Sequence, residues 1–93
     1  NDEIGLGAAQ AVVASGLKGK VIVTGMNGIP PALFAVKRGN MGLTVALNPV
    51  AWGNLGIETM DAQLKGKAFD KQVFVEHLLV DSSNVDKLLP KKN

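Results

Sequence analysis

The chain has 93 residues, a length that allows a single domain at most. Folding hides only about 60 to 65% of the surface that so short a chain exposes when unfolded, so we expect a partner segment or self-association to support its core. The chain has no cysteine, which excludes disulfides and cysteine-based metal sites. Its net charge of +2 is spread along the sequence, and it contains one Trp, three Phe and no Tyr. This composition argues against nucleic-acid binding, which needs clustered basic residues and aromatic platforms.

No apolar run in the sequence approaches the roughly 20 residues that a membrane-spanning helix needs. No signal-peptide pattern occurs in it either. The chain opens on Asn1 and a helix-forming segment, without a strand or an initiator Met before it. We therefore expect it to be a piece of a longer protein, whose leader lies upstream if that protein is exported.

The N-terminal segment is expected to form a helix over residues 3–15. Asp2 or Asn1 supplies the N-cap, and Glu3 lies in the first turn, where the helix dipole favours a carboxylate. Gly16 provides the C-terminal stop. Many residues of this segment are Gly or Ala, so we expect the helix to pack closely on a sheet or on another helix.

Strands and helices alternate after this helix. A continuous β-branched run at residues 21–24 and an apolar run at residues 41–47 predict strands that are buried on both faces. Between them, residues 25–31 have the composition of a turn. A second helix is expected over residues 31–38, where Gly39 ends it.

A third helix is expected to begin with Asn48 as N-cap and Pro49 as its first residue, and to run to Leu64. Its apolar residues recur at helical spacing and are expected to form one face: Val50, Gly53, Ile57, Met60 and Leu64. A last strand is expected over residues 73–80, and a short helical turn is expected to follow from Ser83.

These elements predict an α/β fold, namely part of a parallel open sheet with flanking helices and right-handed crossovers. Three strands do not complete such a sheet alone. In open α/β sheets, ligands bind beyond the carboxyl ends of the strands. These ends correspond here to three places, which are Asn1, residues 25–28 and residues 47–49.

Three patterns that resemble cofactor, metal or catalytic motifs are explained better by local structure. Gly5 and Gly7 give half of a dinucleotide-binding fingerprint, but they lie inside the expected helix. His77 is the only His and has no Cys or second His nearby to share a metal. Ser83 and Asp81 supply, with His77, the residue types of a Ser-His-Asp triad, but no nucleophile elbow accompanies the serine. The sequence therefore predicts no enzyme, no cofactor and no metal site.

The polar residues that remain at the expected strand ends are Asn1, Asn27 and Asn48. An Asn side chain carries two hydrogen-bond donors and one acceptor oxygen, which suits an uncharged polyhydroxylated ligand. The local alternative for each residue is a helix cap or a turn. For Asn48, capping is favoured over ligand binding.

Ordered segments along nearly the whole chain match one known family. They are Asn1-Asp2-Glu3-Ile4-Gly5-Leu6-Gly7-Ala8, Val21-Ile22-Val23-Thr24-Gly25-Met26-Asn27-Gly28, Ala35-Val36-Lys37-Arg38-Gly39, Leu43-Thr44-Val45-Ala46-Leu47-Asn48-Pro49 and residues 53–66. In order and spacing they resemble the C-terminal part of the type I periplasmic sugar-binding proteins, the ribose-binding branch in particular. The resemblance implies the type I periplasmic binding protein fold, in which two α/β lobes close on a sugar or polyol.

The resemblance also implies ligand-binding roles for Asn1, Met26, Asn27 and Leu47. Asn1 matches an Asn of the family that hydrogen-bonds sugar hydroxyls. Met26 and Asn27 stand where the family typically has an aromatic residue followed by Asp. Leu47 stands where ribose-binding members place a Gln. These departures favour a less strongly hydrogen-bonded or differently shaped polyol or deoxy-sugar over ribose itself.

By the same resemblance, residues 1–47 form part of the C-terminal lobe. Residues 48–76 contribute a crossover helix and a strand to the N-terminal lobe, and residues 77–93 are the return segment and tail. The implied function is that of the solute-binding component of an ABC transporter, periplasmic or, in a Gram-positive cell, anchored by a lipid. The implied partners are a sugar or polyol, the transporter permease and the remaining N-terminal part of the same protein.

Two alternatives stay open at this point. One is the effector-sensing core of a lactose-repressor-like transcription regulator, a cytosolic relative with the same fold. Such regulators usually carry Pro-x-Asp before the first strand and Gly-aromatic-Asp after it, where this chain has Gly19-Lys20 and Met26-Asn27. The other alternative is a structural or interaction fragment without a ligand function of its own.

Overall fold

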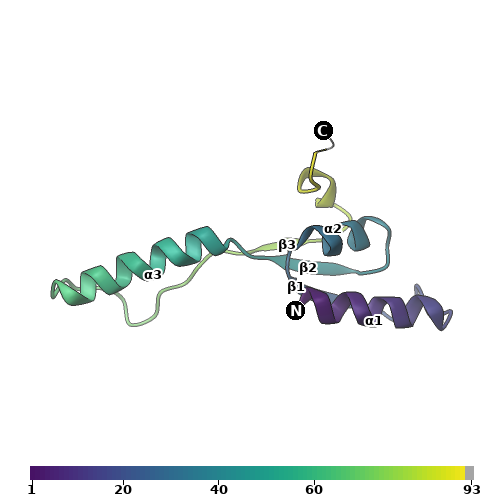
Figure 1. The fold of residues 1–93 in the computed structure, drawn as a ribbon, viewed down its shortest axis with the longest axis horizontal. Helices are drawn as coiled ribbons and strands as arrows, with labels where there is room; N and C mark the ends of the chain where they lie inside the picture. The colour runs from purple at the N-terminus through teal and green to yellow at the C-terminus, as the bar shows by residue number, and fades with distance from the viewer. Residues whose placement is uncertain (92–93) are drawn as a thin grey trace. The chain divides into compact units, whose positions relative to one another are not determined.

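The computed structural model describes residues 1–91, and the chain divides into two compact units. Unit 1 is Asn1–Leu47 together with the chain from Leu78 onward, and unit 2 is Asn48–His77. The elements of unit 1 are α1 (Asp2–Ala14), β1 (Thr24–Asn27), α2 (Pro30–Lys37), β2 (Leu43–Ala46), β3 (Leu78–Val80) and the 3-10 turn η1 (Val85–Lys87) (Figure 1). Unit 2 contains α3 (Pro49–Leu64). The predicted tail extends into residues 92–93, which lie outside the described residues.

The three strands of the described residues form one sheet in the order β1-β2-β3. β1 and β2 are parallel, from Thr24 opposite Leu43 to Asn27 opposite Ala46. The α/β class is therefore confirmed. β3 runs antiparallel to β2, with Leu78 opposite Ala46, so the sheet is mixed and the expectation of an all-parallel sheet was wrong. The first residue of β3 pairs with the last residue of β2. The chain therefore re-enters the sheet at the end where β2 leaves it, and β3 runs in the opposite direction.

The first strand lies three residues later than predicted. The β-branched run at residues 21–23 precedes the strand, and Ile22 is 78% exposed. β1 instead uses Thr24–Asn27, which includes the first three residues of the segment predicted to be a turn. The second strand is shorter than predicted and excludes Met41, which is buried in the core. The last strand is confined to Leu78–Val80.

The helices begin close to their predicted residues because their caps were recognisable. Asn1, the second of the two predicted candidates, is the N-cap of α1, and its Oδ1 accepts a hydrogen bond from the Ile4 amide at 2.9 Å. Asn48 caps α3 in the same way, with Oδ1 accepting from the Ala51 amide at 3.0 Å. α2 begins at Pro30, one residue earlier than predicted.

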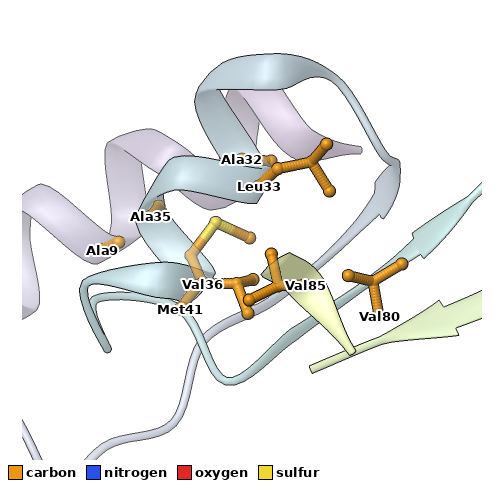
Figure 2. Packing of buried hydrophobic residues seen from close by; sticks show 8 residues of the cluster. All are labelled: Ala9, Ala32, Leu33, Ala35, Val36, Met41, Val80 and Val85. Atoms are coloured by element: carbon orange, nitrogen blue, oxygen red, sulfur yellow. The ribbon is translucent and has the colours of Figure 1, made fainter. Parts of the chain in front are cut away.

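Eight buried apolar residues form the core of unit 1 (Figure 2). They come from α1, α2, β3, η1 and the turn before β2, and are Ala9, Ala32, Leu33, Ala35, Val36, Met41, Val80 and Val85. α1 packs on β1, α2 packs on β2, and the two helices contact each other. This core therefore fixes the start of α1 beside the carboxyl end of β1.

Unit 2 consists of α3 and the chain that follows it, and none of its helical residues is buried. The apolar face predicted for this helix is exposed, with Ile57 at 74% and Leu64 at 80%. The half-buried positions are instead Ala51, Leu55, Thr59 and Ala62. Across residues 1–91, helices with the length and apolar character of a membrane span are absent.

Candidate functional site

The predicted ligand-binding residues meet at one edge of the sheet, at the carboxyl ends of β1 and β2. The backbone amide of Leu47 donates to the carbonyl of Asn27 at 3.0 Å. The amide of Asp2, the residue after Asn1, donates to Oδ1 of Asn27 at 3.3 Å. Met26 precedes Asn27 on β1 and lies opposite Val45. The structure thus brings together the three segments that carry the four predicted contact residues, while their role in binding a ligand stays a prediction.

Most of these side chains are open to solvent within unit 1. Asn1 and Asn27 are exposed, Met26 is 48% exposed, and Leu47 is half-buried. The cluster therefore offers two amide groups and two apolar side chains to a molecule that docks at this edge. It contains no ionised side chain among the predicted contacts.

Asn27 has an unusual backbone conformation, with φ of 138°. L-residues rarely adopt positive φ, and such strain typically costs about 1 to 3 kcal/mol and is concentrated at functional sites. Two contacts hold this conformation: the Leu47 amide on the Asn27 carbonyl and the Asp2 amide on its side chain. The neighbouring Gly28 also has positive φ, at 79°. The chain therefore turns sharply where the strand ends, directly beside the two asparagines.

Asp2 organises this edge, a role that the sequence did not reveal. Its side chain is 0% exposed. Oδ2 accepts from the amides of Gly28 at 2.7 Å and Ile29 at 3.0 Å, and Oδ1 accepts from the hydroxyl of Thr44 at 2.6 Å. One carboxylate thus ties the start of α1 to the turn after β1 and to β2. Asp2 was interpreted only as a helix-start residue, because nothing local in the sequence points to partners 26 to 42 residues away.

Gly25 allows α1 to approach β1 this closely. A Cβ added at Gly25 would overlap Oδ1 of Asp2 and would lie 2.8 Å from Cε of Met41. Side chains need more room than that, so only glycine fits in this position. The contact between this strand and the helix explains why Asp2 reaches the turn beyond the strand.

Two residues of the Ser-His-Asp set, Ser83 and Asp81, lie in unit 1, whereas His77 belongs to unit 2. The Ser83 hydroxyl donates to Oδ1 of Asp81 at 2.5 Å, and Nδ1 of His77 lies 3.4 Å from the Val75 carbonyl. The hydroxyl and the backbone amide of Ser83 both donate to Asp81, which lowers the pKa of this exposed carboxyl. Ser83 therefore supports a turn through Asp81, and the N-cap residue of η1 is Asn84, which makes no side-chain capping bond. Within residues 1–91, no group of three or more potential metal ligands is found.

A surface hollow of unit 1 lies away from this edge. One hollow of about 310 Å³ in unit 1 lies between α1 and α2 and is lined by Leu6, Gln10, Val13 and Arg38, among others. Its residues on α1 belong to the middle and C-terminal part of the helix, whereas Asn1 lies at the N-terminal end. This hollow therefore does not include the predicted contacts at the sheet edge.

The sequence profile of one protein family, the periplasmic binding protein domain, matches residues 1–68. The chain belongs to this family. This chain is 45% identical over 83 residues to the D-allose-binding periplasmic protein of Escherichia coli. The match covers 88% of this chain and 27% of that protein. The ribose import binding protein of Haemophilus influenzae is 40% identical over 76 residues, covering 82% of this chain and 25% of that protein.

The fold of this periplasmic binding protein domain agrees with solved relatives. The structure of the Caulobacter myo-inositol binding protein bound to myo-inositol superposes with a TM-score of 0.72 at 35% identity, over 94% of this chain and 30% of that one. The predicted family and the α/β fold are therefore confirmed. The chain spans between a quarter and a third of the length of these relatives. All three are named as binding proteins, so they give no support to the repressor alternative.

Proposed function

We propose that this chain is the C-terminal part of a solute-binding protein that binds a neutral sugar or polyol for uptake by an ABC transporter. The observation that carries the proposal is the meeting of Asn1, Asn27 and Leu47 at the carboxyl ends of β1 and β2. This is the edge at which open α/β sheets bind ligands. The relatives named for D-allose, ribose and myo-inositol support the same ligand class.

The chemistry of the predicted contacts favours an uncharged ligand. The polar groups among the predicted contacts are the amides of Asn1 and Asn27, and the adjacent carboxylate of Asp2 is buried and occupied by three donors. Met26 and Leu47 present apolar surface, which suits the carbon face of a sugar ring or polyol. An ionic ligand would find no oppositely charged partner among these amides and apolar groups.

The proposed role is binding and delivery rather than catalysis. The partners would be the transporter permease and the remaining N-terminal part of the same protein, and the protein would work outside the cytoplasm, in the periplasm or held by a lipid anchor. Residues 1–47 would belong to the C-terminal lobe, residues 48–76 to the N-terminal lobe and residues 77–93 to the return segment and tail. The division of the chain at Leu47 and His77 supports this assignment.

Calorimetric titration of the full-length protein with D-allose, D-ribose and myo-inositol tests the proposal. We expect saturable one-site binding of at least one of these ligands. Asn27→Ala should weaken that binding by about 1 to 3 kcal/mol, the usual penalty for unpaired buried polar groups. As a matched control, Asn54→Ala changes an exposed Asn of α3 and should leave the affinity unchanged. Binding of none of the three ligands, or equal affinity in Asn27→Ala, would contradict the proposal.

A further inference from the structure

Unit 1 has a second exposed end, at the amino ends of β1 and β2 and opposite to the predicted ligand contacts. α1 starts beside the carboxyl end of β1, runs for 13 residues, and the chain then enters β1 through residues 15–23. α2 starts after the same strand end, and the chain returns to β2 through residues 38–42 (Figure 1). A helix rises about 1.5 Å per residue, so the far end of α1 lies about 20 Å from its start.

The charged side chains of this end are all positive. The sequence contains no Asp or Glu from residue 4 to residue 57, so both connections carry only cations. Lys18, Lys20 and Arg38 are exposed, and within residues 1–91 none of them forms an ion pair. The neighbouring Lys37 differs, because it pairs with Asp86 of η1. Three cations without a carboxylate partner therefore remain at this end.

Hydrogen bonds bring these three cations onto one surface. Nζ of Lys18 donates to the carbonyl of Arg38 at 3.1 Å, which joins the first connection to the second. Lys20 follows Lys18 in a tight turn, in which the Lys20 amide donates to the carbonyl of Leu17 at 2.9 Å. The positive charge is therefore concentrated where the two connections meet.

Exposed apolar side chains are interleaved with these cations. Leu17 is 40% exposed, Val21 is 45% exposed and Ile22 is 78% exposed. Leu17 directly precedes Lys18, and Val21 directly follows Lys20. An acidic protein segment would be matched by the cations alone. Apolar side chains beside cations suit a bilayer surface, because binding there combines burial of apolar area with attraction to anionic lipids.

We propose that this end of unit 1 binds the surface of a bilayer that contains anionic phospholipids. Its residues, named here the basic end, are Leu17, Lys18, Lys20, Val21, Ile22 and Arg38. The cations meet the lipid phosphates, and the apolar side chains enter the boundary between headgroups and acyl chains. The predicted ligand contacts lie at the opposite ends of the same strands, so lipid binding leaves them open. The inference goes beyond the proposed sugar binding and does not depend on which sugar is bound.

Flotation of the full-length protein with lipid vesicles tests the proposal, with the protein prepared free of any covalent lipid. One vesicle preparation contains phosphatidylglycerol and phosphatidylcholine in equal parts, and the other contains phosphatidylcholine alone. We expect the protein to float with the anionic vesicles only. We also expect this binding to weaken as NaCl is raised to about 0.5 M, because salt screens the attraction between exposed charges.

Variants of the basic end identify the residues responsible. Lys18→Gln combined with Lys20→Gln and Arg38→Gln should weaken partition onto the anionic vesicles by about fivefold for each cation removed. If this triple variant does not fold, Lys20→Gln decides alone with a loss of about fivefold. The Lys20 side chain is exposed, so its replacement should not disturb the fold.

The control variant removes three exposed lysines of unit 2, through Lys65→Gln, Lys67→Gln and Lys71→Gln. It changes the net charge by the same amount and should partition as the wild type does. An equal loss in the control, equal binding to neutral vesicles, or no binding to either preparation would overturn the proposal. Binding of soluble poly-L-glutamate without binding of vesicles would also overturn it, in favour of an acidic protein partner. Each of these results would leave the proposed sugar binding standing.

Discussion

At the residue scale, Asp2 holds the site edge together. Its buried carboxylate satisfies two backbone amides and one hydroxyl from two other segments. A buried donor that loses its acceptor costs about 1 to 3 kcal/mol. The carboxylate therefore stabilises the fold and positions Asn1 and Asn27, although it does not itself face the ligand edge.

Replacing Asp2 should weaken the link from the start of α1 to the turn after β1 and to β2. Asp2→Ala should destabilise the full-length protein by about 2 to 4 kcal/mol, because the Gly28 and Ile29 amides and the Thr44 hydroxyl lose their acceptor. Asp2→Asn should cost clearly less, since its oxygen can still serve the two amides while the Thr44 hydroxyl can accept from its nitrogen. Urea unfolding measures both, and hydrogen exchange at Gly28 should accelerate in Asp2→Ala.

Glu3→Ala is the control for this pair of variants. Glu3 is an exposed carboxylate in the same helical turn, so its loss should cost at most about 1 kcal/mol. An Asp2→Ala variant as stable as Glu3→Ala would show that Asp2 acts only through the helix dipole.

The sequence could predict some of these residues and not others. The strand ends that carry Asn1 and Asn27 could be recognised from turn composition and capping residues, whereas Leu47 was named only through the family resemblance, and the binding role of all three stays a prediction. Asp2 was missed because an acidic residue in a first helical turn already has a local explanation. Its true partners are distant in sequence, and no local pattern points to them.

At the scale of elements, the packing of α1 on β1 positions the site, and Gly25 permits it. Gly25→Ala should therefore push the helix away from the strand, destabilise the fold by more than about 2 kcal/mol and weaken ligand binding. Gly7→Ala is the matched control, because a Cβ at Gly7 of α1 meets nothing within 4 Å. It should be neutral or stabilising by up to about 1 kcal/mol. Thermal unfolding compares the two, and equal melting temperatures would contradict this packing account.

The same contact explains why the first strand was misplaced. The β-branched run at residues 21–23 has a strong strand propensity, yet the paired strand is Thr24–Asn27, whose Gly25 and Asn27 are poor strand formers. Tertiary packing against the helix overrides local propensity here. The helix starts were easier to predict, since Asn1, Asn48 and the prolines act locally.

At the scale of the whole molecule, α3 exposes apolar residues that a stable surface would cover. Val50, Ile57, Met60 and Leu64 are all exposed. We therefore predict that the isolated 93-residue chain does not behave as a compact monomer but associates as its concentration rises. Ile57→Glu with Leu64→Lys should reduce this association. Sedimentation measures it, and a cooperatively folded monomer at all concentrations would contradict the prediction.

The proposed two-lobe protein should bend at the ends of unit 2. Ala46 pairs with Leu78, so the chain leaves and returns at neighbouring positions of the sheet. Pro49 fixes its own φ and biases Asn48 towards extended geometry, which Asn48 shows with φ of −112°. Pro49→Gly should relax this connection and change the balance of open and closed forms. Small-angle scattering with and without ligand should then show altered radii of gyration. Unchanged radii and unchanged affinity would identify the segment as an ordinary helix start.

The most direct test of the central claim is a crystal structure of the full-length protein with the tightest-binding ligand of D-allose, D-ribose and myo-inositol. The account predicts ligand oxygens within about 3 Å of the side-chain amides of both Asn1 and Asn27. A ligand bound away from the carboxyl ends of β1 and β2 would contradict it.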